Sequence, residues 1–158
     1  MKGDPKILET LNSLLADELT AINQYMVHSE MCANWGYQKL HKMVEKRAIT
    51  EMKHAERLIG RILFLEGTPM VSRLNEIHIG VDVQQQFKSD WAAEADAIRA
   101  YNNAIRQAME AGDNGTRELL GSILGDEEEH IDLIEAQLDQ IKQMGIQVYL
   151  AEQIAGDG

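Results

Sequence analysis

Apolar residues recur at alternating steps of three and four along most of the chain, and this periodicity predicts amphipathic helices. Four long helices are expected at about residues 5–34, 39–65, 83–111 and 116–144, with a short fifth helix at 146–154. Asp4 and Pro5 supply an N-cap and a first-turn proline for the first helix. Gly67 and Gly145 supply stop signals for the second and the fourth.

Residues 67–82 separate the second predicted helix from the third. They contain Pro69 and Gly80 and mix polar with apolar positions, which is typical of a long crossover rather than a tight turn. Long helices must pack against one another to bury their apolar faces. We therefore expect an all-α protein in which residues 1–158 form a single domain, a four-helix bundle with one long crossover and a short fifth helix.

A carboxylate interrupts the apolar face of each long helix near its middle. On the third helix, Phe87, Trp91, Ile98 and Tyr101 trace this face, and Glu94 lies among them. On the second and fourth helices a histidine follows the glutamate by three residues, so that both side chains lie on one face. The residues directed into the bundle by this pattern are Glu18, Glu51, His54, Glu94, Glu127 and His130.

Four ionised carboxylates in an apolar interior need compensating positive charge, because desolvation would otherwise protonate them. Arg47 is the one basic residue on these faces, so side chains do not supply four positive charges, whereas two divalent cations would. Oxygen and imidazole donors suit iron, manganese, cobalt or zinc. One Glu from each of two helices with Glu-x-x-His from each of two others is a known di-metal pattern in bundles. The sequence therefore predicts a di-metal centre.

The spacing of these residues strengthens the prediction, because a single Glu-x-x-His pair also occurs on solvated helix faces. Glu18 and Glu51 are 33 residues apart, as are Glu94 and Glu127. The two halves of the chain align at an offset of 76 residues, and E-x-x-A-I-x-x-Y occurs at 18–25 and again at 94–101. A duplicated two-helix unit explains this match.

Other residues near these positions allow more than one interpretation. Tyr25 and Tyr101 lie two turns beyond a glutamate on the same face. They either bind ligand carboxylates, act as redox-active phenols, or pack in the core with a satisfied hydroxyl. Asp90 either orients a histidine ligand or is an ordinary solvated aspartate. His28, His41 and His78 fit no pattern and are expected at the surface or at an interface.

The composition favours a soluble protein of the cytoplasm. Acidic residues number 26 and basic residues 15, and the net charge of −11 argues against nucleic-acid or membrane partners. Cys32 is the single cysteine, so no internal disulfide is possible and a reducing compartment is favoured. No apolar run reaches the length of a membrane span, and the first residues contain no apolar signal core.

Segments spread over nearly the whole chain resemble the bacterioferritins, the haem-containing bacterial branch of the ferritin family. They are MKGD at the start, LTAINQY at 19–25, EMKHA at 51–55, RILFLEG at 61–67 and DEEEHID at 126–132. The resemblance implies a ferritin-like fold, a di-iron ferroxidase centre, and a hollow homo-oligomeric shell of twenty-four subunits, built from dimers, that stores ferric mineral. It implies terminal ligands Glu18 and Glu94, bridging ligands Glu51 and Glu127, and one histidine, His54 or His130, on each iron.

The resemblance also changes the interpretation of Met52, which points about 100° away from the metal-facing side of its helix and would otherwise be a packing or interface residue. In bacterioferritins the matching methionines of two subunits bind one haem b between them. Met52 is thus implied as a haem ligand, with Leu19, Ile22, Asn23 and Met26 lining the pocket. The haem would carry electrons, from a donor such as a ferredoxin-type protein, for reduction and release of the mineral.

One stretch departs from the family pattern. Familiar members have a His and an Asp that face the inner cavity, where this chain has Lys46 and Thr50, and neither of these is a useful iron ligand. Glu45 stands where an aromatic residue near the haem is common. These replacements count against an inner-surface iron site and its electron route, while the six centre residues and Met52 are retained.

Iron storage with ferroxidase activity is therefore the leading hypothesis. Two Fe(II) ions would be oxidised by dioxygen or peroxide, and the ferric product would be stored as mineral or stay in the centre as a cofactor. The alternative enzyme is a di-iron or di-manganese peroxidase without mineral storage, which shares the ligand set. A scaffold with purely structural metals is a third possibility, but six ligands over two metals leave open positions, which argues against it.

Overall fold

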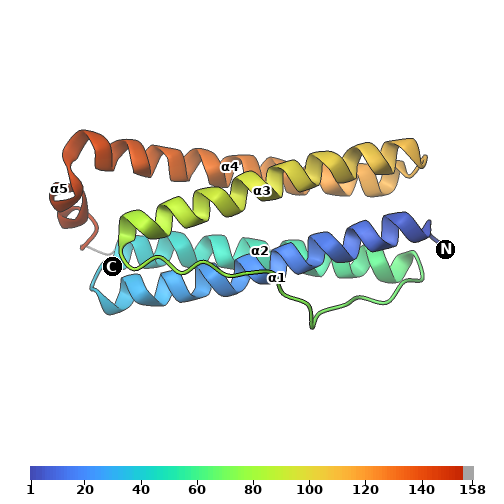
Figure 1. Ribbon diagram of the computed structural model, residues 1–158, viewed down its shortest axis with the longest axis horizontal. Helices are drawn as coiled ribbons and strands as arrows, with labels where there is room; N and C mark the ends of the chain where they lie inside the picture. The colour runs from blue at the N-terminus through green and yellow to red at the C-terminus, as the bar shows by residue number, and fades with distance from the viewer. Residues whose placement is uncertain (155–158) are drawn as a thin grey trace.

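The computed structural model describes residues 1–154, which form an elongated bundle of helices (Figure 1). The helices are α1 Pro5–Asn34, α2 Gln38–Phe64, α3 Val83–Glu110, α4 Asn114–Met144 and the short α5 Ile146–Ala151. α1 packs along α2 and α3 along α4, and the two pairs meet through contacts of α1 with α3 and of α2 with α4. This confirms the all-α four-helix bundle, although α5 ends at Ala151 rather than at residue 154. In the described part of the chain, no helix is apolar over a length that would cross a membrane.

Aspartate side chains begin three of the long helices. Asp4, Asp82 and Asp113 each accept a hydrogen bond from a backbone N–H of the first turn. These bonds satisfy amides that a helix leaves without an internal partner. Gly145 ends α4 with a φ of 81°, a left-handed conformation that glycine adopts without steric cost. Local capping chemistry thus sets the starts of α1, α3 and α4 and the end of α4. The start of α2 has no side-chain cap, and beyond its end Glu66, rather than the expected Gly67, adopts the left-handed conformation.

Residues 65–82 cross from α2 to α3 and lie along α1 (Figure 1). Polar side chains on one face of α1 hold this crossover by accepting hydrogen bonds from its backbone. The backbone N–H groups of Met70, Asn75 and His78 donate to Asn12, Thr20 and Gln24 in that order. Gly80 N donates to His28 Nε2 at 3.0 Å, and a Cβ on Gly80 would lie only 2.3 Å from the backbone nitrogen of Gln86. The close approach therefore requires glycine.

Two apolar clusters fill the bundle on either side of its middle. The first includes Leu11, Leu15, Leu58, Ile62 and Ile123, all fully buried. The second lies at the end that α5 covers, where Tyr149 packs edge-on against Phe87 with ring centroids 6.4 Å apart. Burial of each large apolar side chain contributes about 1.5–3 kcal/mol. The polar middle of the bundle is therefore held between two well-packed regions.

Asp113 ties the start of α4 to α2. Its carboxylate accepts hydrogen bonds from the Thr116 backbone N–H at 3.0 Å, the Thr116 hydroxyl at 2.6 Å and Arg61 Nη2 at 2.9 Å. We expect Asp113→Ala to lower the free energy of unfolding by about 1–2 kcal/mol, because the loss of an N-cap costs this much. Chemical denaturation measures the effect. Asp113→Asn should cost less, since asparagine also caps helices.

The comparison of Asp113→Asn with the wild type also isolates the charge of Asp113. Partial burial raises the pKa of this carboxyl, but the hydrogen bonds from Thr116 and the charge of Arg61 outweigh burial and lower it below 3.8. A carboxyl with a lowered folded-state pKa stabilises the fold above its unfolded pKa, and this contribution is lost as the pH falls through the folded value. The stability difference should therefore be present at neutral pH and vanish in acid. A difference that does not change with pH would contradict this role.

Candidate metal centre

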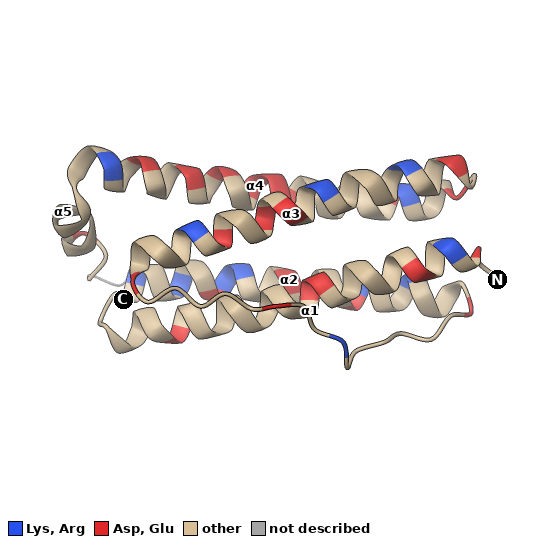
Figure 2. Ribbon diagram, viewed as in Figure 1, with Lys and Arg blue, Asp and Glu red and all other residues tan. Residues whose placement is uncertain are grey.

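The six side chains predicted from the sequence meet in the middle of the bundle, between the two apolar clusters. α1 contributes Glu18 and α3 contributes Glu94, while α2 and α4 each contribute a glutamate and a histidine. Figure 2 shows acidic residues on all four long helices in this region. The four glutamates are almost completely buried. The helix periodicity therefore placed each of these residues on the correct face.

The donor atoms of these side chains form two overlapping groups, each with atoms within 4.8 Å of one another. One group is Glu18, Glu51, His54 and Glu127, and the other is Glu51, Glu94, Glu127 and His130. The shortest contacts join His54 Nδ1 to Glu127 Oε1 at 2.9 Å and His130 Nδ1 to Glu51 Oε1 at 3.0 Å. Because Glu51 and Glu127 belong to both groups, the arrangement suits two neighbouring cations that share two carboxylates.

Each of the six side chains turns one donor atom inward without a hydrogen bond. These atoms are Glu18 Oε2, Glu51 Oε1, His54 Nδ1, Glu94 Oε2, Glu127 Oε1 and His130 Nδ1. Buried polar atoms are almost always hydrogen-bonded, and each exception calls for an explanation such as an ion. Coordination of metal ions would satisfy all six, so the donor set fits a di-metal centre.

Protonation of the cluster follows from the burial of four carboxylates close to one another. Burial and the neighbouring Glu51 charge raise the pKa of Glu18 well above its ordinary value. Burial opposes charge on the histidines, but the surrounding carboxylates outweigh it, so that Glu51 and Glu94 raise the pKa of His130 to about 9. The pKa of His54 is raised in the same way by Glu127, Glu18 and Glu51. Without metal, the cluster therefore holds protons where cations would bind.

Two buried tyrosines hold the glutamates that come from α1 and α3. Tyr25 donates its hydroxyl hydrogen bond to Glu94 Oε1 at 2.6 Å, and Tyr101 donates to Glu18 Oε1 at 2.5 Å. Each bond occupies one carboxylate oxygen and leaves the other, an unsatisfied one, turned toward the centre. The structure therefore shows both core packing with a satisfied hydroxyl and the hydrogen bond to a carboxylate of the centre, because both tyrosines are fully buried.

Asp126 contacts the centre although the sequence pattern does not single it out. Its Oδ2 lies 2.8 Å from His54 Nε2, the ring nitrogen that faces away from the centre. A carboxylate on the outer nitrogen fixes the tautomer of a metal-binding histidine and presents the other nitrogen to the metal. In the sequence, Asp126 is notable only because it directly precedes Glu127, and the sequence does not show which side chain it contacts.

The expectations for His28 and Asp90 were wrong. His28 is completely buried rather than at a surface, because the crossover covers it: Gly80 N donates to its Nε2, and its Nδ1 lies 2.9 Å from Asp90 Oδ1. Asp90 is also buried, and its partners are Arg47 at 2.9 Å, Gln24 at 2.9 Å and His28, not a histidine of the centre. These residues form a second polar network beside the centre.

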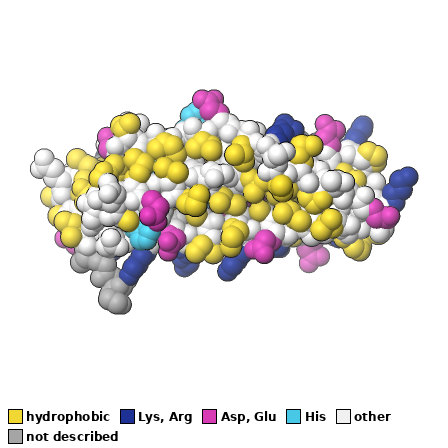
Figure 3. Space-filling view, turned by 90° about the horizontal axis from the view of Figure 1, so that it is seen from below, with side chains coloured by type: hydrophobic (Ala, Val, Ile, Leu, Met, Phe, Trp, Pro, Cys, Tyr) yellow, Lys and Arg dark blue, Asp and Glu magenta, His cyan; other side chains and the backbone are white. Residues whose placement is uncertain are grey.

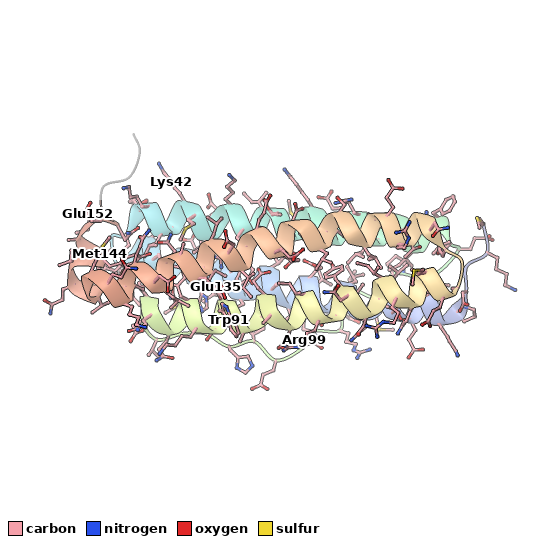
Figure 4. The ribbon with its side chains drawn as sticks, turned by 90° about the horizontal axis from the view of Figure 1, so that it is seen from above. Lys42, Trp91, Arg99, Glu135, Met144 and Glu152 are labelled. Atoms are coloured by element: carbon pink, nitrogen blue, oxygen red, sulfur yellow. The ribbon has the colours of Figure 1, made fainter. Side chains whose placement is uncertain are left out.

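The expectation that Trp91 lies on the inward face of its helix was also wrong. It is exposed on α3, where its Nε1 donates to Glu135 Oε2 at 2.9 Å, and Figure 4 shows the two labelled side chains close together between α3 and α4. The inward position one residue earlier is taken by Asp90, whose charge is neutralised by Arg47. The remaining histidines differ: His78 is exposed, as expected, whereas His41 is partly buried against Ser29.

A cavity of about 480 Å³ lies between α1, α3 and the crossover, and reaches the centre. Its inner wall includes Glu18, Glu51 and Glu127. Its outer wall includes the acidic side chains Asp17, Glu76 and Asp96. The cavity therefore joins three carboxylates of the centre to acidic side chains nearer the surface, and its remaining wall is largely apolar, with Lys88 as its one lysine.

The comparisons with known proteins agree with this arrangement. The family model for the ferritin-like domain matches residues 8–144. The chain is 41% identical over 152 residues to a bacterioferritin of Mycolicibacterium paratuberculosis, with 96% of each chain covered, and the same figures hold for bacterioferritin BfrA of Mycobacterium tuberculosis. It is 40% identical over 147 residues to a bacterioferritin of Rhodobacter capsulatus, covering 93% of this chain and 91% of that one. The chain therefore belongs to the bacterioferritins, within the ferritin-like family.

Proposed function

We propose that this protein stores iron and is a ferroxidase, which oxidises Fe(II) at the six-residue centre and retains the ferric product in a hollow homo-oligomeric shell of twenty-four subunits. The observation that carries the proposal is the set of six inward, unsatisfied donor atoms, divided into two groups that share Glu51 and Glu127. Such a set suits two divalent cations held a short distance apart. The bacterioferritin relatives support storage as the purpose of the oxidation.

Fe(II) is the substrate in this proposal. Two Fe(II) ions replace the protons of the cluster, and each gives one electron to a single dioxygen molecule, which takes up two protons and leaves as hydrogen peroxide. With hydrogen peroxide as oxidant, the same two electrons and two protons yield two water molecules. Carboxylate oxygens are hard donors and favour the more highly charged Fe(III). Glu51 and Glu127 hold both ions, while Tyr25 and Tyr101 keep Glu94 and Glu18 oriented toward them.

A haem b between two subunits is the second part of the proposal, with Met52 as its ligand. Met52 is 46% exposed on α2, so its thioether is free to meet a group held against a partner subunit. Met26, Val27 and Ile49 are also exposed, and Figure 3 shows a face of the molecule with hydrophobic side chains over much of its length. Exposed apolar side chains on α1 and α2 are what a large apolar group between two subunits would pack against. Bound haem would carry electrons, from a donor such as a ferredoxin-type protein, to the stored mineral.

Replacement of Met52 by alanine tests the haem assignment. We expect Met52→Ala to lose the haem absorption after reconstitution, because the ligand sulfur is removed, while Fe(II) oxidation continues since Met52 lies outside the six-residue centre. Met109→Ala, which removes an exposed methionine of α3, is the matched control and should keep the haem spectrum. An unchanged spectrum in Met52→Ala would remove Met52 as the haem ligand.

The test of the proposed function is addition of Fe(II) in air to the metal-free protein, at many irons per subunit. Ferric absorbance gives the rate, and size-exclusion chromatography shows whether the iron travels with a large particle. We expect oxidation faster than in the protein-free control, with the iron kept in solution inside the particle. Fast oxidation followed by precipitation would favour the peroxidase alternative. Oxidation no faster than the control would overturn the ferroxidase assignment.

A further inference from the structure

The internal repeat relates the two halves of the centre residue by residue. At the offset of 76, Glu18 corresponds to Glu94, Glu51 to Glu127 and His54 to His130, and each corresponding pair is chemically identical. The residues directly before Glu127 and Glu51 break this equivalence, because they are Asp126 and Thr50. The two histidines of the centre therefore have different neighbours at corresponding positions.

Asp126 anchors His54. Its Oδ2 lies 2.8 Å from His54 Nε2, and the side chain of His54 is only 1% exposed. The carboxylate fixes the proton on Nε2, so that the Nδ1 lone pair points to the centre, and it raises the basicity of the ring. Both effects favour a metal ion in the group formed by Glu18, Glu51, His54 and Glu127.

Thr50 gives His130 no such anchor. Its hydroxyl donates to the backbone oxygen of Lys46 at 3.1 Å, one turn back on α2, and it carries no charge. Among residues 1–154, no side chain or backbone group makes a hydrogen bond or ion pair with His130 Nε2. The side chain of His130 is 12% exposed, against 1% for His54. Its ring is therefore less constrained in tautomer and orientation.

We infer that the two metal positions are unequal, and that the position at Glu51, Glu94, Glu127 and His130 binds divalent cations more weakly because Thr50 stands where Asp126 stands in the other half. The inference rests on the proposed di-metal centre. Loss of an outer partner of a metal ligand weakens metal affinity by about 10–100-fold. The position at His130 is thus the last to fill.

The experiment is an anaerobic titration of the full metal-free protein with Co(II), followed by its visible absorption, which reports binding without iron chemistry. The wild type should bind in two steps whose affinities differ by about 10–100-fold. Thr50→Asp should raise the Co(II) affinity of the weaker position and so reduce the difference between the two affinities. Asp126→Thr should lower the affinity of the stronger position. Thr50→Val, which keeps the shape of threonine without its hydroxyl, should leave both steps unchanged.

The outcomes separate this inference from the proposed function. Two Co(II) ions bound with equal affinity by the wild type would overturn the inference and leave the di-metal centre standing. The inference would also be overturned if Thr50→Asp left the difference between the two Co(II) affinities unchanged. It would likewise be overturned if Thr50→Val weakened the second binding step. Absence of tight Co(II) binding would instead overturn the centre itself. Asp126→Thr tests the role of the histidine anchor independently, because it changes the metal position at His54 rather than the one at His130.

Discussion

Replacement of Glu127 by alanine is expected to slow the oxidation of Fe(II) by about 100-fold or more. Loss of a residue that only supports a metal ligand costs about 10–100-fold, and Glu127 is proposed to contact the metal directly. It also belongs to both donor groups, so its removal affects both metal positions, whereas Glu18 and Glu94 belong to one group each. Stopped-flow absorbance at two Fe(II) per subunit measures the initial rate.

Glu128→Ala is the matched control, because Glu128 is the next residue on α4 and its side chain is exposed. It removes the same kind of side chain and should leave the rate within about twofold of the wild type. Glu127→Ala should also fold, since the two apolar clusters on either side of the centre are left intact. Circular dichroism and the size of the assembly check this. Equal rates in the two variants would contradict the assignment of Glu127 to the centre.

The helices and the inward faces of this bundle were predictable because local rules govern them. The apolar period set the four long helices, capping residues such as Asp4 and Gly145 set their bounds, and the repeat of 76 residues placed the six centre residues on facing helices. The structure brings those six side chains together as predicted. Metal binding by them, and haem binding by Met52, stay predictions.

The polar network at Asp90 was not predictable from the same rules. Polarity alone favoured Trp91 as the inward residue of α3 and a surface position for His28, and both expectations were wrong. Asp90 is stable inside the bundle only because α1, α2 and the crossover bring Gln24, Arg47 and His28 to it. Such a network depends on the packing of elements that are distant in the sequence, and a single helix pattern does not show it.

The Arg47–Asp90 pair gives the largest stability effect that we expect. Arg47 Nη1 donates to Asp90 Oδ2 at 2.9 Å, both side chains are at most 5% exposed, and the guanidinium lies 4.9 Å from the centre of the Tyr25 ring. Arg47→Ile leaves the Asp90 carboxylate buried without its cation. Breaking a buried ion pair from one side costs about 3–5 kcal/mol. Guanidinium denaturation of the metal-free protein at a fixed protein concentration measures the loss.

The other half of the bundle supplies the control for this pair. At the offset of 76 residues, Arg47 corresponds to Ile123 and Asp90 to Leu14, and both of these side chains are buried. The double variant Arg47→Ile with Asp90→Leu therefore introduces a pair that this fold already packs. It should recover part of the stability lost by Arg47→Ile, because no unpaired charge remains. Recovery should be incomplete, since His28 and Gln24 lose their acceptor, and each unsatisfied buried group costs about 1–3 kcal/mol. A double variant less stable than Arg47→Ile would show that the ion pair is not the reason for the loss.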